Sequence, residues 1–240
     1  MERNRKILIT NDDGIDSDGL RRLVKEAVKF GEVWVVAPDG QRSAVSHSIT
    51  LHKHLDVYPY DFGIEGVHAF SCTGMPADCV RVGSISVMPY KPDVVITGIN
   101  DGYNAATDIQ YSATVGGAME AAFQGYPAIA FSEGRERHEV TDRCLHDVLE
   151  ELIDQIPGEG KVINVNFPEC TWEQYRGILR DRKASKGVFF LDSYPLLEEL
   201  SNGGKRYMVH GERQYEADEG TDLRALYDGY ISIGLISNLC

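Results

Sequence analysis

The sequence has no long hydrophobic run. A helix that crosses a membrane needs about 20 consecutive apolar residues, and no stretch of the 240 residues approaches this length. The charged start, residues 1–6, is followed by only four apolar or near-apolar residues. That is too short for the core of a signal peptide. We therefore expect a cytoplasmic protein that makes no membrane contact.

Cysteine is scarce, and its placement excludes two common structural roles. The five cysteines are odd in number, scattered along the chain, and form no C-x-x-C pair. This pattern is untypical of disulfide frameworks and of zinc sites, and it fits reduced thiols that pack in the interior. The positions are Cys72, Cys79, Cys144, Cys170 and Cys240.

Basic residues are outnumbered by acidic ones. The chain has 24 Lys and Arg against 37 Asp and Glu, which gives a formal charge of -13. Phosphate backbones are held by clustered Lys and Arg, so general binding to nucleic acid is not expected. A phosphorylated small molecule stays open as a ligand, because a metal ion and a helix N-terminus can reverse the field locally.

Short apolar runs alternate with amphipathic segments, which is typical of an α/β protein with a parallel sheet. Strands are expected at 7–10, 32–37, 93–97, 128–132 and 161–166, and extended or hairpin structure at 49–71. Helices are expected at 16–30, from Thr73, from Ser112 or Thr114 to Phe123, and at 144–156. We predict one α/β domain over residues 1–240, with its core at about 1–170.

The last third of the sequence, from about residue 171, has shorter apolar runs and many tyrosines. We expect a hairpin that pairs 207–210 with 212–216, a helix capped by Thr221 or Asp222, and a final strand at 228–236. This third is interpreted as an excursion from the sheet and not as an independent domain.

Two adjacent acids, Asp12 and Asp13, follow the first predicted strand. Ligands of open α/β sheets bind at the carboxyl ends of strands, and Gly14 permits the chain to turn there. Two carboxylates about 4 Å apart repel by roughly 4 kcal/mol at an effective dielectric of about 20. A divalent cation, a proton or separation must relieve this repulsion, and we favour the cation. The alternative is an ordinary turn before a capped helix.

Ser43 and Asn100 lie on the loops after the second and third strands of the core. Each offers a neutral oxygen, and with the two carboxylates they could complete an oxygen-only shell. Such a shell suits magnesium, manganese or calcium better than zinc. Taken alone, either residue would more often be an ordinary loop residue.

A glycine-rich helix start follows Asn104, Ser112 and Thr114. Unpaired amides and the helix dipole attract anions there, although ordinary N-capping is an equal alternative. Gly116 and Gly117 lower helix stability by roughly 1 kcal/mol each relative to alanine, so we expect a close backbone approach or an exposed amide terminus.

Two further polar residues lie on the loop after the second strand. His47 is a candidate proton donor, or else an ordinary loop histidine. Arg42 could contact a phosphate or pair with a surface acid.

Five ordered blocks resemble one known family. They are ILITNDDGI at 7–15 with Gly19 and Leu20, APD at 37–39 with RS at 42–43 and HS at 47–48, TGMPADC at 73–79, GIN at 98–100 with Asn104, and YSATV at 111–115. The match resumes with EGTD at 219–222 and GY at 229–230. Together these blocks are similar to SurE, the survival protein E family of metal-dependent nucleotidases.

The resemblance implies a Rossmann-like core, a mostly parallel sheet with helices on both faces, and a C-terminal hairpin extension at about 171–240 used in dimerisation. It implies hydrolysis of nucleoside 5′- or 3′-monophosphates, with short polyphosphate as a further substrate, by a homodimer or homotetramer. The implied ligands of Mg²⁺ or Mn²⁺ are Asp12, Asp13, Ser43 and Asn100, of which the two acids are catalytic. From the helix start described above, we predict Asn104, Ser112 and Thr114 as the phosphate-binding residues, with His47 as a further candidate.

The sequence departs from the family pattern at two positions. Ala106 and Ala113 stand where the family usually has glycine. Two other classes of function stay open: a nucleoside hydrolase with a calcium-binding acidic cluster, and a non-enzymatic metal-dependent sensor of a phosphorylated ligand.

Overall fold

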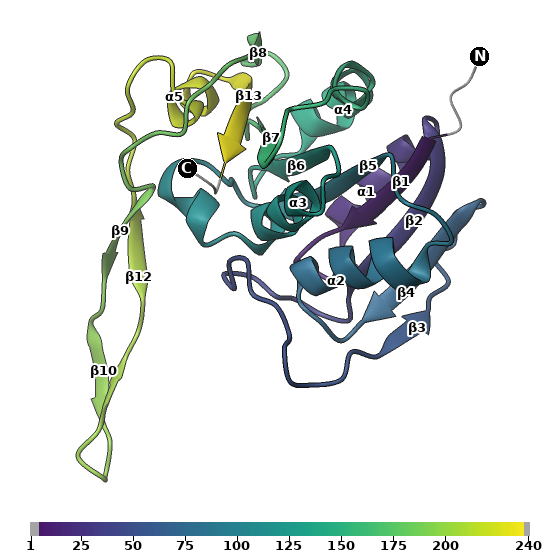
Figure 1. Cartoon of the computed structure of the whole chain (residues 1–240). Helices are drawn as coiled ribbons and strands as arrows, with labels where there is room; N and C mark the ends of the chain where they lie inside the picture. Colours follow the sequence, from purple (N-terminus) through teal and green to yellow (C-terminus); the bar gives the residue numbers. More distant parts are fainter. Residues whose placement is uncertain (1–4, 238–240) are drawn as a thin grey trace.

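The structure is a computed structural model that describes residues 5–237, so the first four residues of the charged start, and Cys240, lie outside the described part. Its centre is a nine-stranded sheet in the order β3-β4-β2-β1-β5-β6-β7-β13-β8 (Figure 1). The strands are β1 (Arg5–Thr10), β2 (Gly31–Pro38), β3 (Val57–Pro59), β4 (Val67–Cys72), β5 (Val94–Asp101), β6 (Ala128–Glu133), β7 (Lys161–Phe167), β8 (Gly177–Leu179) and β13 (Tyr230–Ser237).

The order of the strands reverses beside β1. Strands β2 and β4 extend the sheet on one side of β1, and β5, β6 and β7 extend it on the other, all in parallel pairs. The carboxyl ends of β1 and β5 therefore flank a topological switch point, where a crevice for a ligand is expected. This is the end of the sheet that carries the two acids at positions 12 and 13.

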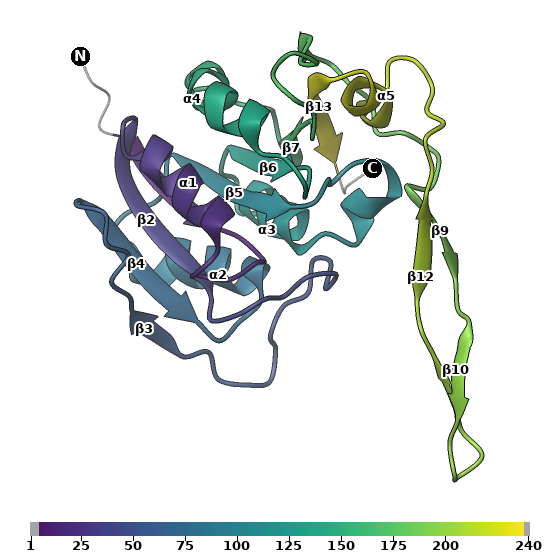
Figure 2. The same cartoon turned by 180° about the vertical axis from the view of Figure 1, so that it is seen from behind.

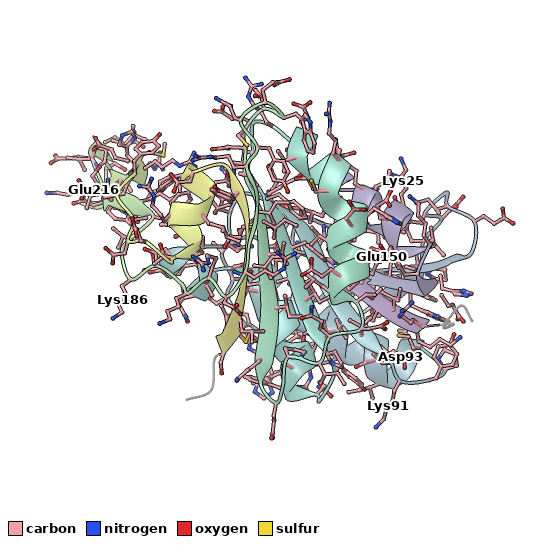
Figure 3. All side chains as sticks on the ribbon, turned by 90° about the horizontal axis from the view of Figure 1, so that it is seen from above. Lys25, Lys91, Asp93, Glu150, Lys186 and Glu216 are labelled. Carbon is pink, nitrogen blue, oxygen red and sulfur yellow. The ribbon has the colours of Figure 1, made fainter. Side chains whose placement is uncertain are left out.

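Helices cover both faces of the sheet (Figures 1 and 2). Helices α1 (Asp18–Ala27) and α4 (Glu139–Leu152) pack on one face, and α2 (Pro76–Val82) and α3 (Ala113–Phe123) pack on the other. The predicted α/β class with helices on both faces is confirmed. Within residues 5–237, every helix is too short or too polar to span a bilayer. Charged side chains such as Lys25 and Glu150 lie at the outer surface (Figure 3).

The last third contributes both to the sheet and to a long projection. Strand β13 pairs antiparallel with β7 and parallel with β8, so the end of the chain is part of the central sheet. Between β8 and β13 in the sequence, residues 190–213 form an arm of two paired chain segments that extends away from the body (Figures 1 and 2). The short helix α5 (Asp222–Tyr227) begins after Thr221, whose side chain accepts from the backbone N–H of Arg224, as predicted.

The predicted pairing within this arm is wrong. Residues 207–210 do not face 212–216. Instead, β12 (His210–Arg213) pairs with β9 (Phe190–Ser193), and β11 (Lys205–Tyr207) pairs with β10 (Leu196–Glu199). The turn lies at Ser201–Gly204, where the N–H of Leu200 donates to the carbonyl of Gly204. The two glycines at 203 and 204 therefore mark the turn, and the predicted hairpin placed it too late.

Three smaller differences concern element ends. Helix α4 begins at Glu139 rather than Cys144, because its first turn buries Val140 and Thr141 before the amphipathic pattern becomes regular. Helix α2 is capped at Met75 and not at Thr73. Gly31 begins β2 instead of ending α1. The expected hairpin at 49–71 is confirmed by the antiparallel pairing of β3 with β4.

A buried ion pair fixes the carboxyl end of β6 against both helices of one face. The Arg22 guanidinium donates to both carboxylate oxygens of Glu133, whose side chain is only 2% exposed. Arg22 also donates to Asp18 of α1 and Asp142 of α4. The carbonyl of Glu133 accepts from the N–H of Gly102, so this cluster also holds the loop after β5.

We expect Arg22→Met to lower the free energy of unfolding by about 3–5 kcal/mol, because it leaves the Glu133 carboxylate buried without its cation. Urea unfolding at neutral pH is the measurement. The matched control is Arg206→Met, which removes an exposed pair with Glu198 on the arm and should cost less than about 1 kcal/mol. Equal losses in the two variants would contradict a structural role for the buried pair.

Candidate active site

Asp12 lies at the end of β1 and is held in a fixed turn. The side chain of Asn11 donates to the carbonyl of Gly14 at 3.0 Å and to the Ser17 hydroxyl at 2.7 Å. Gly14 has a φ of +98°, a conformation that favours glycine. The N–H of Ile15 then donates to the carbonyl of Pro38 at the end of β2. The turn therefore needs the glycine, as the sequence predicts.

The hydroxyl of Thr114 joins the ends of two strands. It donates to Oδ1 of Asp12 at 2.5 Å, and its oxygen lies 3.4 Å from Oδ1 of Asn100. Asp12 comes from the turn after β1, Asn100 from β5, and Thr114 from the first turn of α3. The Asn100 amide N–H donates to the carbonyl of Gly102 at 2.7 Å, which fixes the side-chain oxygen as the end free to act as a ligand.

Asp13 is held separately from Asp12. Its Oδ2 accepts from the backbone N–H of Asp101 at 3.1 Å. Burial raises the pKa of Asp12 to about 6, with the Thr114 hydrogen bond opposing and the charge of Asp13 adding to the shift. Burial also raises the pKa of Asp13, although the Asp101 N–H opposes it. Burial is the main cause of both shifts, so a carboxylate charge at this point is costly when nothing positive lies beside it.

The loop after β2 brings Ser43 to the same place. The N–H of Arg42 donates to the carbonyl of Asp12 at 2.7 Å, and the N–H of Ser46 donates to the carbonyl of Tyr111 at 2.9 Å. Ala44 and Ser46 have φ values of 57° and 54°, an unusual conformation for residues with a side chain. The loop is therefore tied at both ends, to the turn after β1 and to the residues before α3.

One cavity of about 490 Å³ collects most of the predicted site residues. Asp12, Ser43, Asn100, Asn104 and Ser112 all line it. Thr114 does not line the cavity, but it is fully buried and its hydroxyl donates to the lining residue Asp12. Asp13 does not line it either, but it accepts from the backbone N–H of the lining residue Asp101. The structure thus brings together residues from β1, β5, α3 and two loops.

The residues expected at the helix start are confirmed as neighbours of the cavity. Ser112 is the N-cap of α3, and its oxygen accepts from the N–H of Val115 at 3.0 Å, which leaves its own hydroxyl proton free to donate. The Asn104 amide donates to the Ser132 hydroxyl at 2.8 Å, and its backbone is held by Asn164 and Asn166 of β7. Ser112 thus has the predicted capping role, and anion binding at this helix start stays a prediction.

His47 is not brought into the cavity. Its Nε2 lies 2.8 Å from the Glu120 carboxylate on α3, and Glu120 also pairs with Arg81 of α2. The imidazole packs against Phe123, with ring centroids 5.2 Å apart. His47 therefore links its loop to the outer side of α3, and nothing in this arrangement points it at a ligand in the cavity. Arg42 pairs with Asp39 at the surface, one of its two predicted roles.

The sequence analysis missed a large part of the cavity lining. Asp101, Asp108, Arg135, Glu136 and Glu169 contribute charge. Burial raises the pKa of Asp108 to about 6, with Asp192 of the arm adding to the shift and Arg135 opposing it. Four aromatic side chains and a second guanidinium also line the cavity, and they are Tyr103, Tyr111, Phe189, Phe190 and Arg213. Only Asp101 and Asp108, inside the polar stretch after β5, carried a local signal.

The two positions that depart from the family pattern differ in the structure. Ala106 has a φ of 52°, the conformation that glycine adopts without strain, and its N–H is fixed by the Asp222 carboxylate at 3.0 Å. Ala113 is the first residue of α3 and has an ordinary helical backbone. The alanine at 113 therefore has a backbone conformation that suits any residue. The alanine at 106 has one that favours glycine and is held in it by the hydrogen bond to Asp222.

No group of three or more His, Cys, Asp or Glu side chains placed to hold a metal ion occurs in the described part of the chain. The cysteines at 72, 79 and 144 are buried free thiols and Cys170 is half-buried, which confirms the predicted packing role. A cation at the cavity would therefore depend on two carboxylates completed by neutral oxygens. That donor set suits a hard divalent ion and not zinc.

Gly116 lets the loop that carries Ser43 lie directly on α3. A Cβ at Gly116 would lie 2.5 Å from the carbonyl oxygen of Ser46 and 3.0 Å from Cα of His47, both of which belong to the backbone. A Cβ at Gly117 would lie 3.3 Å from the Thr97 methyl group, a much smaller intrusion. The predicted close approach is thus confirmed at Gly116.

We expect Gly116→Ala to destabilise the protein by about 1–3 kcal/mol by displacing this loop, despite the better helix propensity of alanine. Gly117→Ala, one residue further along the same helix, is the matched control and should change stability by less than about 1 kcal/mol. Urea unfolding of both variants is the measurement. A Gly116→Ala protein as stable as the control would show that the loop does not depend on this contact.

Comparisons with known proteins agree with the resemblance of the motifs. The family profile described as Survival protein SurE matches residues 7–187. The protein called 5′-nucleotidase SurE from Thermoanaerobacter sp. (strain X514) is 37% identical over 242 residues, covering 95% of this chain and 90% of that protein. The 5′/3′-nucleotidase SurE from Erwinia tasmaniensis is 35% identical over 231 residues, covering 95% and 88%.

A solved structure gives the same result for the fold. The crystal structure of SurE protein from Aquifex aeolicus matches with a TM-score of 0.81 and 35% identity, and the match covers 98% of this chain and 94% of that one. Motifs, full-length sequence identity and fold therefore lead to one conclusion. This chain is a member of the SurE family.

Proposed function

We propose that this protein is a metal-dependent nucleotidase that hydrolyses nucleoside 5′- or 3′-monophosphates to nucleoside and phosphate. Relatives that match it over 95% of its length carry the names 5′-nucleotidase and 5′/3′-nucleotidase. The observation that carries the proposal is the meeting of Asp12, Ser43, Asn100 and Ser112 along one cavity at the switch point of the sheet.

The charge of the cavity supports a requirement for a cation. Five carboxylates line it, and only two guanidinium groups do. One of those, Arg213, is paired with Glu169. A phosphomonoester carries up to two negative charges, so this lining would repel it unless a positive ion is bound. The acidic cavity and an anionic substrate are compatible when a divalent ion is part of the site.

Asp12, Asp13, Ser43 and Asn100 would hold the divalent ion, with Mg²⁺ or Mn²⁺ fitting their oxygens. When bound, such an ion polarises phosphoryl oxygens and lowers the pKa of a coordinated water. The hydroxyl of Thr114 orients Asp12 through its 2.5 Å hydrogen bond. The backbone N–H of Asp101 orients Asp13 in the same way.

Phosphate would lie at the N-terminus of α3. The Ser112 hydroxyl has a free proton there, and the first amides of an 11-residue helix give a favourable field for an anion. Asn104 presents an amide whose second N–H has no partner among the hydrogen bonds of the described residues. These groups would hold the transferring phosphoryl group while water attacks it.

We expect Asp12→Asn to abolish divalent-ion-dependent phosphate release, lowering kcat/KM by at least about 100-fold, while leaving the unfolding transition in place. The charge, and not the size, of the side chain is removed, and the Thr114 hydroxyl can still donate to the amide oxygen. The measurement is a phosphate-release panel over nucleoside monophosphates, with chelator and with added manganese or magnesium.

The matched control is Asp181→Asn, the same change at an exposed position with a φ of 58°, which asparagine tolerates well. It should retain normal activity. Near-normal turnover by Asp12→Asn would remove the proposed role of this carboxylate. Release of free base in place of phosphate would select a nucleoside hydrolase, and binding without any turnover would select a sensor.

We infer that the arm supports a homodimer or homotetramer. Its strands expose several large apolar side chains away from the body, at Leu191, Tyr194, Leu196, Leu197, Met208 and Val209, each between 48% and 63% exposed. Apolar side chains gathered on a projecting hairpin favour contact with another protein surface, and a second copy of the chain is the partner that the family resemblance implies.

We expect Leu197→Glu combined with Val209→Glu to shift the protein towards monomer, because two charges would have to be buried in the interface. Light scattering coupled to size-exclusion chromatography is the measurement. The control pair is Ile156→Glu with Ile85→Glu, exposed apolar residues on the body. An unchanged mass in the arm variant would contradict this role of the arm.

A further inference from the structure

The segment EGTD at 219–222 contains a buried carboxylate that the proposed chemistry does not use. Asp222 is the first residue of α5 and is only 4% exposed. Its Oδ1 accepts from the backbone N–H of Ser185 at 2.8 Å and from that of Leu223 at 2.7 Å. Its Oδ2 accepts from the backbone N–H of Ala106 at 3.0 Å. Hydrogen bonds to a carboxylate are stronger than those between neutral groups, so this one side chain firmly joins three segments of the chain.

Ala106 lies between the two groups that are proposed to hold phosphate. Asn104 precedes it and Ser112 follows it, and both line the cavity. The Asn104 backbone is tied to β7 by two asparagine side chains. Ser112 is fixed as the N-cap of α3. The segment 105–111 therefore has to connect two anchored residues, and its backbone sets how they lie relative to one another.

The backbone of this segment bends at Ala106. Among residues 105–111, only Ala106 has a positive φ, of 52°, and it is 5% exposed. The left-handed conformation costs a residue with a side chain about 1–2 kcal/mol, which is a factor of roughly 5 to 30 in population. Glycine adopts it almost without cost. The alanine that stands here in place of glycine therefore needs a contact that offsets this cost, and the hydrogen bond to Asp222 is such a contact.

We propose that Asp222 is a positioning residue for the phosphate site. Its Oδ2 holds Ala106 in the left-handed conformation and thereby keeps Asn104 and Ser112 at the spacing that fits one phosphate group. This proposal rests on the proposed nucleotidase function and adds a residue outside the cavity on which substrate binding depends. Asp222 does not line the cavity, so it acts through the backbone and touches no substrate. Since Ser185 precedes the arm, the same carboxylate also ties the phosphate site to the last third of the chain.

The variant Asp222→Asn separates the hydrogen bond to Ala106 from the other two. An amide has one oxygen, which can take the place of Oδ1 and accept from the N–H groups of Ser185 and Leu223. The NH₂ group of the amide then faces the N–H of Ala106, and two donors form no hydrogen bond. The start of α5 therefore keeps its contacts while Ala106 is released.

We expect Asp222→Asn to raise KM for adenosine 5′-monophosphate by roughly 5- to 30-fold with kcat nearly unchanged. Without its hydrogen bond, Ala106 adopts the left-handed conformation in only a fraction of the molecules, and the apparent affinity falls by that fraction. The affinity for inorganic phosphate, measured by calorimetric titration in the presence of manganese, should fall by the same factor. A merely structural role would unfold a share of the molecules, which lowers kcat and leaves KM unchanged.

The decisive variant combines Asp222→Asn with Ala106→Gly, because glycine adopts the left-handed conformation without help. Ala106→Gly alone, and the double variant, should both keep KM within about 2-fold of the original protein. A double variant as impaired as Asp222→Asn would overturn the proposal. If Asp222→Asn alone does not fold, a folded and active double variant supports the proposal. An unfolded double variant then overturns it, because Asp222 would serve α5 and not Ala106.

The matched control is Asp93→Asn, at the opposite end of the sheet. The Asp93 carboxylate accepts from the backbone N–H of Lys6 at 2.8 Å, so the same change removes a hydrogen bond of the same kind away from the cavity. It should leave KM and the phosphate affinity unchanged. An increase in KM as large as that of Asp222→Asn would show a general effect of lost stability and overturn the proposal.

The phosphate titration separates this proposal from the proposed activity. Failure of the original protein to release phosphate from nucleotides refutes the nucleotidase proposal. A phosphate affinity that Asp222→Asn lowers and Ala106→Gly restores still supports the positioning role in that case. Normal turnover with unchanged KM and phosphate affinity in Asp222→Asn refutes the positioning role alone. An original protein that binds no phosphate in the presence of manganese refutes the phosphate site, and the positioning role with it.

Discussion

The structure depends on the burial of the Asp12 carboxylate just after β1, with the half-buried Asp13 next to it. Asp12 is only 3% exposed and its pKa is raised to about 6, so its charged form is costly in this position. The surrounding elements supply what limits this cost: the Thr114 hydroxyl reaches Asp12 from α3, and the Asp101 N–H reaches Asp13 from β5. Both α3 and β5 are thus joined to the turn after β1 by hydrogen bonds to its carboxylates. The glycine at 116 then lets the Ser43 loop close over the same point.

The fold and the candidate site can be predicted from the sequence where one short segment determines both the backbone conformation and the side chains at the cavity. The run at 7–15 combines a buried strand, two acids and a glycine with positive φ, so the turn, the position of the acids and the strand could all be predicted from nine residues. Ser43 and Asn100 were found because the carboxyl ends of parallel strands meet at one edge. For the same reason the α/β class followed from the alternation of apolar runs.

Contacts between distant segments could not be predicted in this way. His47 has no sequence neighbour that reveals Glu120, which lies 73 positions away on α3. The pairing in the arm was misplaced because its strands are exposed on both faces, so no hydrophobic alternation fixes their register. Phe190 and Arg213 belong to that same arm, and their place at the cavity depends on this register. An error of a few residues in the pairing therefore concealed the place of these two side chains at the cavity.

The cavity is lined by acidic side chains, which repel anions, and by aromatic side chains, which carry no charge. These two kinds of side chain have different effects on which ligand can bind. Four carboxylates remain when the pair of Glu169 with Arg213 is set aside, and Arg135 is the remaining guanidinium in the lining. The divalent ion proposed for this site would attract an anion, but its attraction acts on every phosphomonoester alike and cannot distinguish a nucleotide from a sugar phosphate. Selection between phosphomonoesters must then come from contacts with the part of the ligand that the ion does not touch. The aromatic side chains that the root of the arm adds to the lining, Phe189 and Phe190, are the uncharged groups available for such a contact.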